Sequence, residues 1–374
     1  MFSSFDHRMM RRALELAALG RHTNHPNPRV GCVVVQGERI VGEGWHRKWG
    51  EPHAEPLALA AAGDAARGAT VYVSLEPHSY HGRTPPCTEA LIRAGVKMVV
   101  CGALDANPKV HGQGVEQMRA AGIEVLTGLL ENESRELNLG FEKRMQTGLP
   151  RVIVKIAASL DGRVALANGK SQWITSPAAR ADVQRLRAEA SAVLTGIETV
   201  IADDPRLTVR DPSIDLLGRH PLRVVLDSKL RTPASARMFR EPGEVLILTD
   251  RALADGAGAQ TLREKGAILR GLALDAADEP SRIDLSHVLR ELGERQCNDV
   301  LVEAGPTLSG RFLALRLADE LIVYLAPKLL GPDARPLFQL PLIENLEDGI
   351  QFDLHSTARI GPDLKLVLRP QRRN

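Results

Sequence analysis

The chain has 374 residues, of which 44% are hydrophobic and 25% charged, a composition typical of a globular protein with more than one core. Its formal net charge is +2, no basic run stands out and aromatic residues make up only 3%, so the sequence disfavours a polynucleotide partner. Residues 1–20 are too short and too interrupted by charge for a membrane span or a signal peptide, and they predict an amphipathic helix. The four cysteines lack the spacing of a disulfide framework, which indicates a reducing cytoplasm.

After this helix, the first half of the chain predicts short strands that alternate with helices. Strands at 30–35 and 39–45 are joined by a tight turn at Gly37. The elements that follow are a helix at 54–62, a strand at 70–75, a helix at 87–94, a strand at 96–102, a helix at 112–121, a strand at 123–128 and a polar helical segment at 129–146. This alternation indicates an α/β layered domain with some parallel pairing.

The second half restarts the pattern after TGLP at 147–150. Its predicted elements are a strand with a turn at 151–162, strands at 192–196, 223–227, 244–249, 299–305 and 320–327, and helices at 177–189 and 306–315. We therefore expect two α/β domains, residues 1–147 and 148–374, each with its own core.

Chemistry in the first half is concentrated in three motifs, His53-Ala54-Glu55, Glu76-Pro77-His78 and Pro85-Pro86-Cys87. They are similar to the zinc-deaminase signature, in which zinc activates a water and a glutamate that is not a ligand moves the proton. Glu55 is therefore the expected proton carrier. Cys87 is expected in the first turn of a helix, where the dipole favours a thiolate, and His53 opens a helix after a proline. Pro56 would remove one helix hydrogen bond unless that helix starts late.

The sequence departs from the signature at His78, which stands where the first cysteine of a pair is expected. Because histidine is itself a good zinc ligand, we expect His53, His78 and Cys87 to hold zinc, in a site with one more positive charge. Two alternatives stay open: a degenerate site on an intact fold, and His81 as a substitute ligand.

The stretch HAEPLAL…GATVYVSLEPHSYHGRTPPCTEALIRAGV resembles the bifunctional riboflavin-biosynthesis deaminase/reductase family, and GRTPPC is particularly distinctive of it. Further matches follow in order over nearly the whole chain, namely HPNPRVGCVVV (25–35), DANPKVHGQG (105–114), KIAASLDGR (155–163), SQWITSP (171–177), GIETVIADDPRLTVR (196–210), RVVLDS (223–228) and VEAGPTLSGRFL (302–313).

This resemblance implies two consecutive reactions. A cytidine-deaminase-like three-layer domain would hydrolytically deaminate 2,5-diamino-6-(5-phosphoribosylamino)pyrimidin-4(3H)-one. A dihydrofolate-reductase-like domain would then use NADPH to reduce the ribosyl group of the product to ribityl. The family further implies a cytoplasmic homo-oligomer that acts on small molecules, with neither nucleic acid nor a membrane as partner.

Two other functions compete with this interpretation. One is a reductase whose deaminase domain is degenerate because His78 replaces a cysteine. The other is a nucleic-acid base deaminase with an appended domain, since RNA and DNA editors share the zinc signature. The low aromatic content and the reductase-like second half argue against the latter.

The resemblance also assigns residues to both sites. Lys155 and Asp203 are candidates for orienting the sugar or relaying protons, although Asp203 could equally cap a turn. Expected cofactor contacts are Ala157, Trp173, Thr199, Asp203, Ser228, Gly305, Pro306, Thr307, Leu308, Ser309, Gly310 and Arg311. Expected substrate contacts are Asn27, Ser171, Arg187, Leu207, Arg210 and Glu303.

Physical reasons support some of these assignments. Gly305 and Pro306 stand at a strand-to-helix junction, where backbone N–H groups meet phosphates, and Arg187 and Arg210 suit a sugar phosphate because guanidinium binds it bidentately. Asn27 is a candidate for reading the pyrimidine edge, or simply a residue of an Asn-Pro turn. The histidines without matching partners are expected at the surface or in structural roles, and they are His22, His46, His220, His287 and His355.

Overall fold

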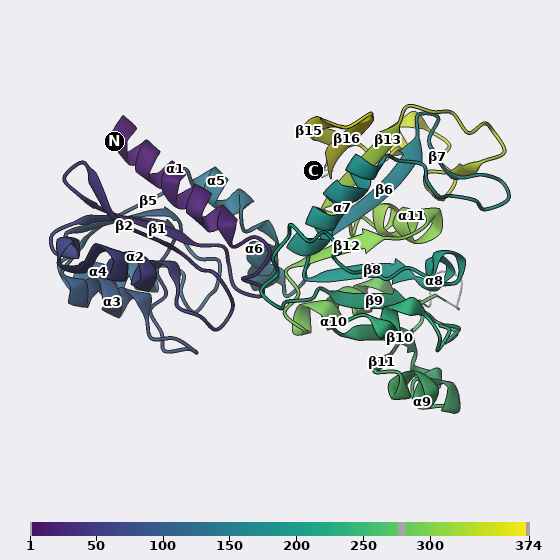
Figure 1. Ribbon diagram of the computed structural model, residues 1–374, viewed down its shortest axis with the longest axis horizontal. Helices are drawn as coiled ribbons and strands as arrows, with labels where there is room; N and C mark the ends of the chain where they lie inside the picture. The colour runs from purple at the N-terminus through teal and green to yellow at the C-terminus, as the bar shows by residue number, and fades with distance from the viewer. Residues whose placement is uncertain (1, 276–281, 372–374) are drawn as a thin grey trace. The chain divides into compact units, whose positions relative to one another are not determined.

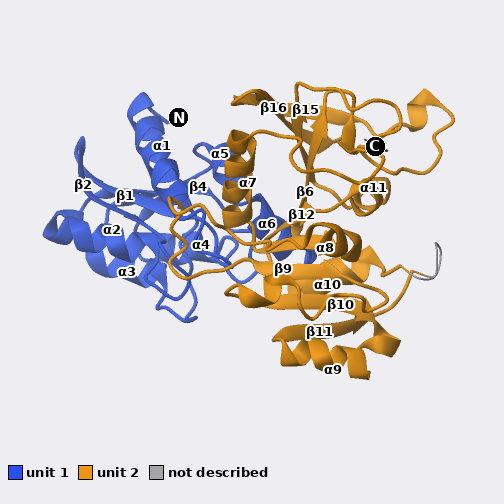
Figure 2. Ribbon diagram, turned by 45° about the vertical axis from the view of Figure 1, so that its right-hand side comes forward, with its two compact units in different colours: residues 1–149 blue, residues 150–374 orange. Residues whose placement is uncertain are grey.

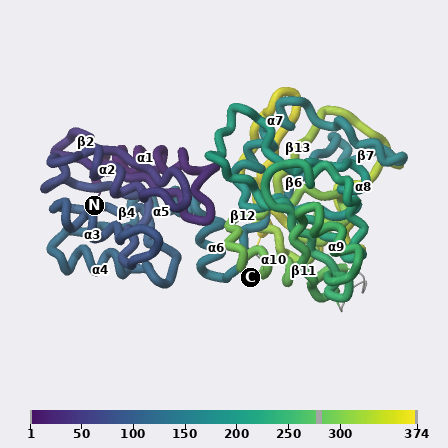
Figure 3. The backbone as a smooth tube through the Cα atoms, turned by 60° about the horizontal axis from the view of Figure 1, so that its bottom comes forward, coloured from purple at the N-terminus to yellow at the C-terminus, as the bar shows by residue number. Residues whose placement is uncertain are grey.

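The computed structural model describes residues 2–275 and 282–371 (Figure 1). It divides into two compact units, Met1–Leu149 and Pro150–Asn374 (Figure 2). The chain leaves the first unit after its last helix and does not return to it (Figure 3). No helix within the described ranges is long and apolar enough to cross a bilayer.

The first unit is built on a five-stranded sheet in the order β2-β1-β3-β4-β5. The strands are β1 (Gly31–Gln36), β2 (Arg39–Trp45), β3 (Thr70–Leu75), β4 (Met98–Ala103) and β5 (Glu124–Thr127). The first three in spatial order pair antiparallel, and β3, β4 and β5 pair parallel. Gly37, with φ +63°, makes the predicted turn between β1 and β2, because glycine adopts this region without strain. The predicted strands of this half are confirmed.

Helices cover both faces of this sheet. They are α1 (Ser4–Leu19), α2 (Ala54–Ala62), α3 (Cys87–Ala94), α4 (Gln113–Ala120), α5 (Glu131–Glu136) and α6 (Leu139–Thr147), with a 3-10 turn at Gly63–Ala66. Alternate strand residues point to opposite faces, so Val34 and Val73 pack toward α2, α3 and α4, whereas Val33 and Tyr72 pack toward α1. Figure 1 shows α1 and α5 on one side of the sheet and α2, α3 and α4 on the other. This three-layer arrangement places the starts of α2 and α3 on the same side.

Within the described residues, the second unit has a nine-stranded sheet in the order β11-β10-β9-β8-β12-β6-β13-β16-β15. The strands are β6 (Arg151–Ser159), β8 (Ala192–Gly196), β9 (Leu222–Leu226), β10 (Val245–Asp250), β11 (Ala267–Leu272), β12 (Asp299–Glu303), β13 (Glu320–Ala326), β15 (Phe352–Ile360) and β16 (Asp363–Pro370). The strands from β11 to β13 are parallel, and the β15–β16 hairpin adds an antiparallel edge. A separate two-stranded sheet joins β7 (Arg163–Ala165) to β14 (Arg335–Pro336). Because the carboxyl ends of parallel strands share one edge, ligand sites in such sheets form there.

The helices of this unit are α7 (Pro177–Glu189), α8 (Ile197–Asp203), α9 (Ala257–Glu264), α10 (Leu285–Glu294) and α11 (Pro306–Ala314), with 3-10 turns at Arg237–Arg240, Arg251–Leu253 and Leu346–Asp348. The sequence sets several of their starts. Ser176 caps α7 by accepting a hydrogen bond from the N–H of Ala179, and a proline follows it at the first helical position. Pro306 likewise starts α11 directly after β12, as the sequence predicted.

Candidate active sites in the two units

The three motifs of the first half come together at the starts of two helices. His53 is the N-cap residue of α2, Cys87 is the first residue of α3, and His78 lies in the loop after β3. Both predicted helix starts are confirmed. Pro56 falls in the first turn of α2, where a backbone N–H has no intrahelical partner in any case, so it removes no helix hydrogen bond.

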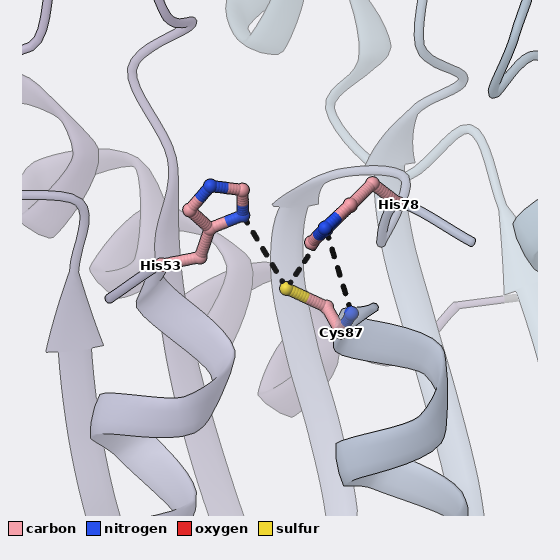
Figure 4. A group of neighbouring side chains, drawn as sticks. All are labelled: His53, His78 and Cys87. Carbon is pink, nitrogen blue, oxygen red and sulfur yellow. Dashed lines mark hydrogen bonds between the residues drawn. The ribbon is translucent and has the colours of Figure 1, made fainter. Parts of the chain in front are cut away.

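The side chains of these residues point at one another (Figure 4). Their donor atoms all lie within 4.8 Å of each other, and no other such group of three occurs within residues 2–275 and 282–371. The Sγ atom of Cys87 is 3.1 Å from Nδ1 of His78 and 3.5 Å from Nδ1 of His53. Tetrahedral zinc with Zn–N of about 2.05 Å and Zn–S of about 2.3 Å would separate nitrogen from sulfur by about 3.5 Å. The donor set therefore fits zinc, with a fourth position left for water.

The alternative ligand His81 is not part of this group. Its Nε2 atom lies 3.1 Å from a carboxylate oxygen of Glu89, and its side chain is exposed. His78, by contrast, is within hydrogen-bond distance of both the thiol and the backbone N–H of Cys87. The geometry thus favours His78 over His81 as the third donor.

Burial dominates the electrostatics of the site. It raises the pKa of the Glu55 carboxyl and of the Cys87 thiol, and it lowers the pKa of His53 to about 3, with a further contribution from the neighbouring imidazole of His78. A bound cation reverses this tendency for the thiol, because a coordinating thiol is deprotonated. Oε2 of Glu55 is buried without a hydrogen-bond partner in the described structure. A buried acceptor beside three metal donors is suited to hold a water molecule and move its proton.

A cavity of about 220 Å³ opens over these residues. Its wall includes residues from distant parts of the sequence, namely Asn27, His46, Trp49, Tyr80, Arg83, Asp105, Asn107 and Phe141. His46, expected at the surface or in a structural role, is not at the surface, because it is 2% exposed, and it lines this cavity. Arg83 belongs to the distinctive GRTPPC motif, and Asp105 and Asn107 to DANPKVHGQG. These two motifs could have indicated that Arg83, Asp105 and Asn107 belong to the site. No motif in the sequence around His46 gives such an indication.

Glu76 fixes the loop between β4 and α4, which forms one wall of the cavity. Its Oε2 atom accepts hydrogen bonds from the N–H groups of Asp105 (3.2 Å) and Gly112 (3.0 Å). Its Oε1 atom accepts from those of Gly114 (3.0 Å) and Val115 (3.2 Å). One buried carboxylate thus satisfies four main-chain donors. It lies two residues before His78 in the chain, so the same segment supplies a metal donor and a loop anchor.

The second unit contains a cavity of about 670 Å³ next to the carboxyl ends of β8, β9 and β12. Many of the residues assigned to the reductase line it, namely Lys155, Ala157, Ser171, Thr199, Asp203, Ser228, Glu303, Gly305, Pro306, Thr307, Leu308 and Arg311. It is also lined by Arg282, Arg335 and Gln339, which the sequence did not single out. The cavity therefore combines a helix N-terminus, several cations and three carboxylates.

Glu303, which lines this cavity, belongs to a charged group that extends behind the cavity wall. Arg187 on α7 binds Glu303 at the end of β12 through two hydrogen bonds, Nε–Oε1 at 2.6 Å and Nη2–Oε2 at 2.9 Å. Burial alone would raise the pKa of Glu303, but the charge of Arg187 holds it below its usual value. Lys155 has its pKa lowered by burial, an effect that Glu303 opposes. Arg187 and Arg210 also both donate to the carbonyl oxygen of Thr208.

Some residues assigned to the reductase do not line the cavity, and they are Trp173, Arg187, Leu207, Ser309, Gly310 and Arg210. Trp173 is 64% exposed and packs against the guanidinium of Arg180. Leu207 is part of the hydrophobic core, and the hydroxyl of Ser309 donates to the carbonyl of Ala304. Gly310 packs so closely on the backbone of Gln339 that a Cβ atom would lie 2.1 Å from its oxygen.

Comparisons with known proteins agree with the two sites. The family model described as "RibD C-terminal domain" matches residues 150–366, and "Cytidine and deoxycytidylate deaminase zinc-binding region" matches residues 3–103. The riboflavin biosynthesis protein RibD of Escherichia coli (strain K12) is 49% identical over 97% of this chain and 99% of its own length. That of Haemophilus influenzae is 46% identical over 99% of both.

Solved structures extend this similarity to three dimensions. RibD of Acinetobacter baumannii, form 1, has a TM-score of 0.91 and 44% identity over 98% of this chain and 99% of its own. A Thermotoga maritima protein described as a diaminohydroxyphosphoribosylaminopyrimidine deaminase/5-amino-6-(5-phosphoribosylamino)uracil reductase has a TM-score of 0.85 and 35% identity, with the same coverage. The predicted α/β class, with a deaminase-like first half and a reductase-like second half, is confirmed.

Proposed function

This chain belongs to the RibD family of bifunctional riboflavin biosynthesis enzymes, with a deaminase and a reductase domain, and we propose how its two sites divide the work. Residues 1–147 would deaminate 2,5-diamino-6-(5-phosphoribosylamino)pyrimidin-4(3H)-one. Residues 148–374 would reduce the ribosyl group of the product to ribityl with NADPH. The observation that carries the first assignment is the His53, His78 and Cys87 donor set, at zinc-like distances beside Glu55.

In the deaminase site, His53, His78 and Cys87 would hold zinc. When bound, zinc lowers the pKa of a coordinated water to near neutrality. The buried Glu55 carboxylate would take a proton from that water and pass it to the ring nitrogen next to C2. As the water oxygen adds to C2, that ring nitrogen is protonated. Glu55 would then move the remaining proton of the added oxygen to the amino group, so that the C2–N bond breaks, ammonia departs and the oxygen becomes the C2 carbonyl oxygen.

In the reductase site, bound NADPH would supply the hydride. As C1′ of the ribosyl group receives it and the C1′–O4′ bond opens, O4′ needs a proton to become a hydroxyl. Lys155 is suited to give that proton, because its ammonium is desolvated within the cavity and faces the carboxylate of Glu303. Asp203 lines the same cavity and would orient the sugar hydroxyls.

Phosphate groups would bind at two places in this unit. The first turn of α11, with Gly305 as its N-cap residue, offers backbone N–H groups to the cofactor phosphates. Arg210 forms no ion pair within the described residues and would bind the sugar phosphate, whereas the guanidinium of Arg187 is occupied by Glu303. The family resemblance alone supports three further proposals: NADPH over NADH, a cytoplasmic homo-oligomer, and small molecules as the only partners.

Zinc analysis with paired activity assays tests this function. We expect about one equivalent of zinc in the purified protein, lost in His78→Ala. Glu55→Gln should keep the zinc and the NADPH-dependent reduction of the deaminated intermediate while deamination disappears. Protein that holds little zinc and shows no deamination after zinc loading would support the reductase-only alternative. Loss of both activities in folded Glu55→Gln would contradict independent active sites.

A further inference from the structure

Asp161 stands between β6 and β7 in the KIAASLDGR motif, and no step of the two reactions uses it. Its Oδ2 atom accepts hydrogen bonds from the N–H groups of Leu330 (3.0 Å) and Gly331 (2.8 Å), the latter 170 positions away in the chain. Its Oδ1 atom accepts one from the hydroxyl of Ser159. The bond from Ser159, together with the two main-chain bonds, lowers the pKa of this carboxyl, so the group is a carboxylate at neutral pH.

Residues 328–336, here called the strap, run from the end of β13 into β14, which pairs antiparallel with β7. Two further hydrogen bonds fix the strap to the β6–β7 segment. The N–H of Leu160 donates to the carbonyl of Lys328 (2.9 Å), and Nη1 of Arg163 donates to the carbonyl of Ala334 (3.3 Å). The strap and β7 together contribute four residues to the wall of the reductase cavity, namely Val164, Ala165, Arg335 and Pro336.

The chain that follows the strap is attached to the first turn of α11. The N–H of Gln339 donates to the carbonyl of Pro306 (3.1 Å), and the hydroxyl of Thr307 donates to Oε1 of Gln339. Four residues of chain span at most about 14 Å, so Arg335 stands no farther than that from Gln339. Arg335 and the start of α11 therefore belong to neighbouring parts of the cavity wall.

The guanidinium of Arg335 lies at this wall without a partner. A Cβ atom on Gly169, which also lines the cavity, would lie 3.1 Å from Nη2 of Arg335. Among the residues that the structure describes, Arg335 forms no ion pair and its side chain no hydrogen bond. Arg311 on the same wall is instead paired with Asp275 at 3.0 Å. An unpaired guanidinium near a helix start is suited to phosphate, which it can bind bidentately.

We propose that Arg335 binds a phosphate group in the reductase cavity and that Asp161 is the positioning residue that holds the strap carrying it. This inference rests on the proposed reductase function. Two ligands of that function carry phosphate, the nicotinamide cofactor and the ribosylaminopyrimidine. The attachment of the chain to the first turn of α11 favours the cofactor. Because the strap is already fixed on both sides of Arg335, little conformational freedom is lost when the phosphate binds.

Two constants measured on the full-length protein identify the phosphate. Binding of NADPH alone is followed by quenching of protein fluorescence, and the KM of the deaminated intermediate by oxidation of NADPH. Arg335→Met should weaken NADPH binding by about 10- to 100-fold, the usual effect of losing hydrogen bonds to a charged group, and Arg335→Lys should recover part of the loss. A similar rise in the KM of the intermediate, with NADPH binding intact, would assign the sugar phosphate instead. Arg359→Met removes an exposed arginine of β15 outside the cavity and should change neither constant.

Variants of Asp161 test the positioning role. Asp161→Ala removes both acceptors and should raise the constant that responds to Arg335→Met by about tenfold, with kcat at saturation little changed. Asp161→Asn should stay within about twofold of wild type, because its oxygen can still accept both main-chain N–H groups of the strap while its NH₂ group donates to the hydroxyl of Ser159. If Asp161 acts through Arg335, then Asp161→Ala adds no further loss to Arg335→Met.

Three results would overturn the proposal. Unchanged constants in Arg335→Met would remove the phosphate contact. Equal losses in Asp161→Ala and Asp161→Asn, or multiplied losses in the double variant, would remove the positioning role. Circular dichroism reports the folding of each variant, and Asp161→Ser, whose side chain is too short to reach the strap, replaces Asp161→Ala if the latter does not fold. A wild-type protein that shows the NADPH binding pattern but does not reduce the intermediate would contradict the proposed reductase activity alone.

Discussion

Replacement of Glu76 by glutamine tests how the first unit builds its cavity. The carboxylate accepts four main-chain hydrogen bonds, two on each oxygen, from residues Asp105 to Val115. Glutamine keeps one oxygen and replaces the other with an NH₂ group. In either orientation, two backbone N–H groups lose their acceptor and meet a donor instead. The shape of the side chain hardly changes, so the effect isolates hydrogen bonding.

The expected magnitude follows from these four bonds. A buried donor left without a partner costs about 1–3 kcal/mol, so two of them cost about 2–6 kcal/mol before the loop relaxes. Since a domain is stable by about 5–15 kcal/mol, we expect the loop at 105–115 to open locally while the sheet persists. Hydrogen exchange should become faster in that loop, and deamination should fall by more than about tenfold, since Asp105 and Asn107 move with it.

The second unit provides a built-in control for this experiment. Glu76 has no part in the reductase cavity, so reduction of the deaminated intermediate should remain at the wild-type rate. Exchange rates and deamination within about twofold of wild type would refute the reasoning, because they would mean that the four hydrogen bonds contribute little net free energy.

Three further predictions address single residues. Burial raises the pKa of the Asp105 carboxyl from 3.8 to about 7, so the folded first unit is more stable with this group protonated, and that stability is lost as the pH rises from 3.8 through about 7. Asp105→Asn should therefore stabilise the first unit by about 1–3 kcal/mol near pH 8 but not near pH 4. A denaturant midpoint that differs from the wild-type midpoint by the same amount at both pH values would contradict this. Arg187→Met would leave the buried Glu303 carboxylate unpaired, at a cost of about 3–5 kcal/mol in urea unfolding of the second unit, and an unchanged midpoint would show that the pair is not needed. His78→Cys should bind zinc more tightly in competition with a chelator, because a thiolate adds negative charge to the site, and weaker binding would argue against residue 78 as a ligand.

Local sequence determined the elements that carry the chemistry. The prolines before His53 and Cys87 mark the starts of α2 and α3, and the β-branched runs mark the central strands, because these signals depend only on neighbouring residues. The β15–β16 hairpin escaped prediction because β15 lies at the sheet edge, where an exposed strand needs no hydrophobic alternation. The polar segment 129–146, predicted to be helical, contains two helices, which meet near Asn138.

Which of those residues meet was decided by the tertiary structure. Arg187 and Glu303 are 116 positions apart, and they pair because α7 packs near the end of β12. Asn27 and His46 meet only because β1 and β2 form a hairpin with their outer ends together. Such contacts depend on strand order and register, which are set by the packing of whole elements and not by any short pattern. The sequence therefore identified the metal donors and the glutamate, whereas the fold alone placed the residues that orient them.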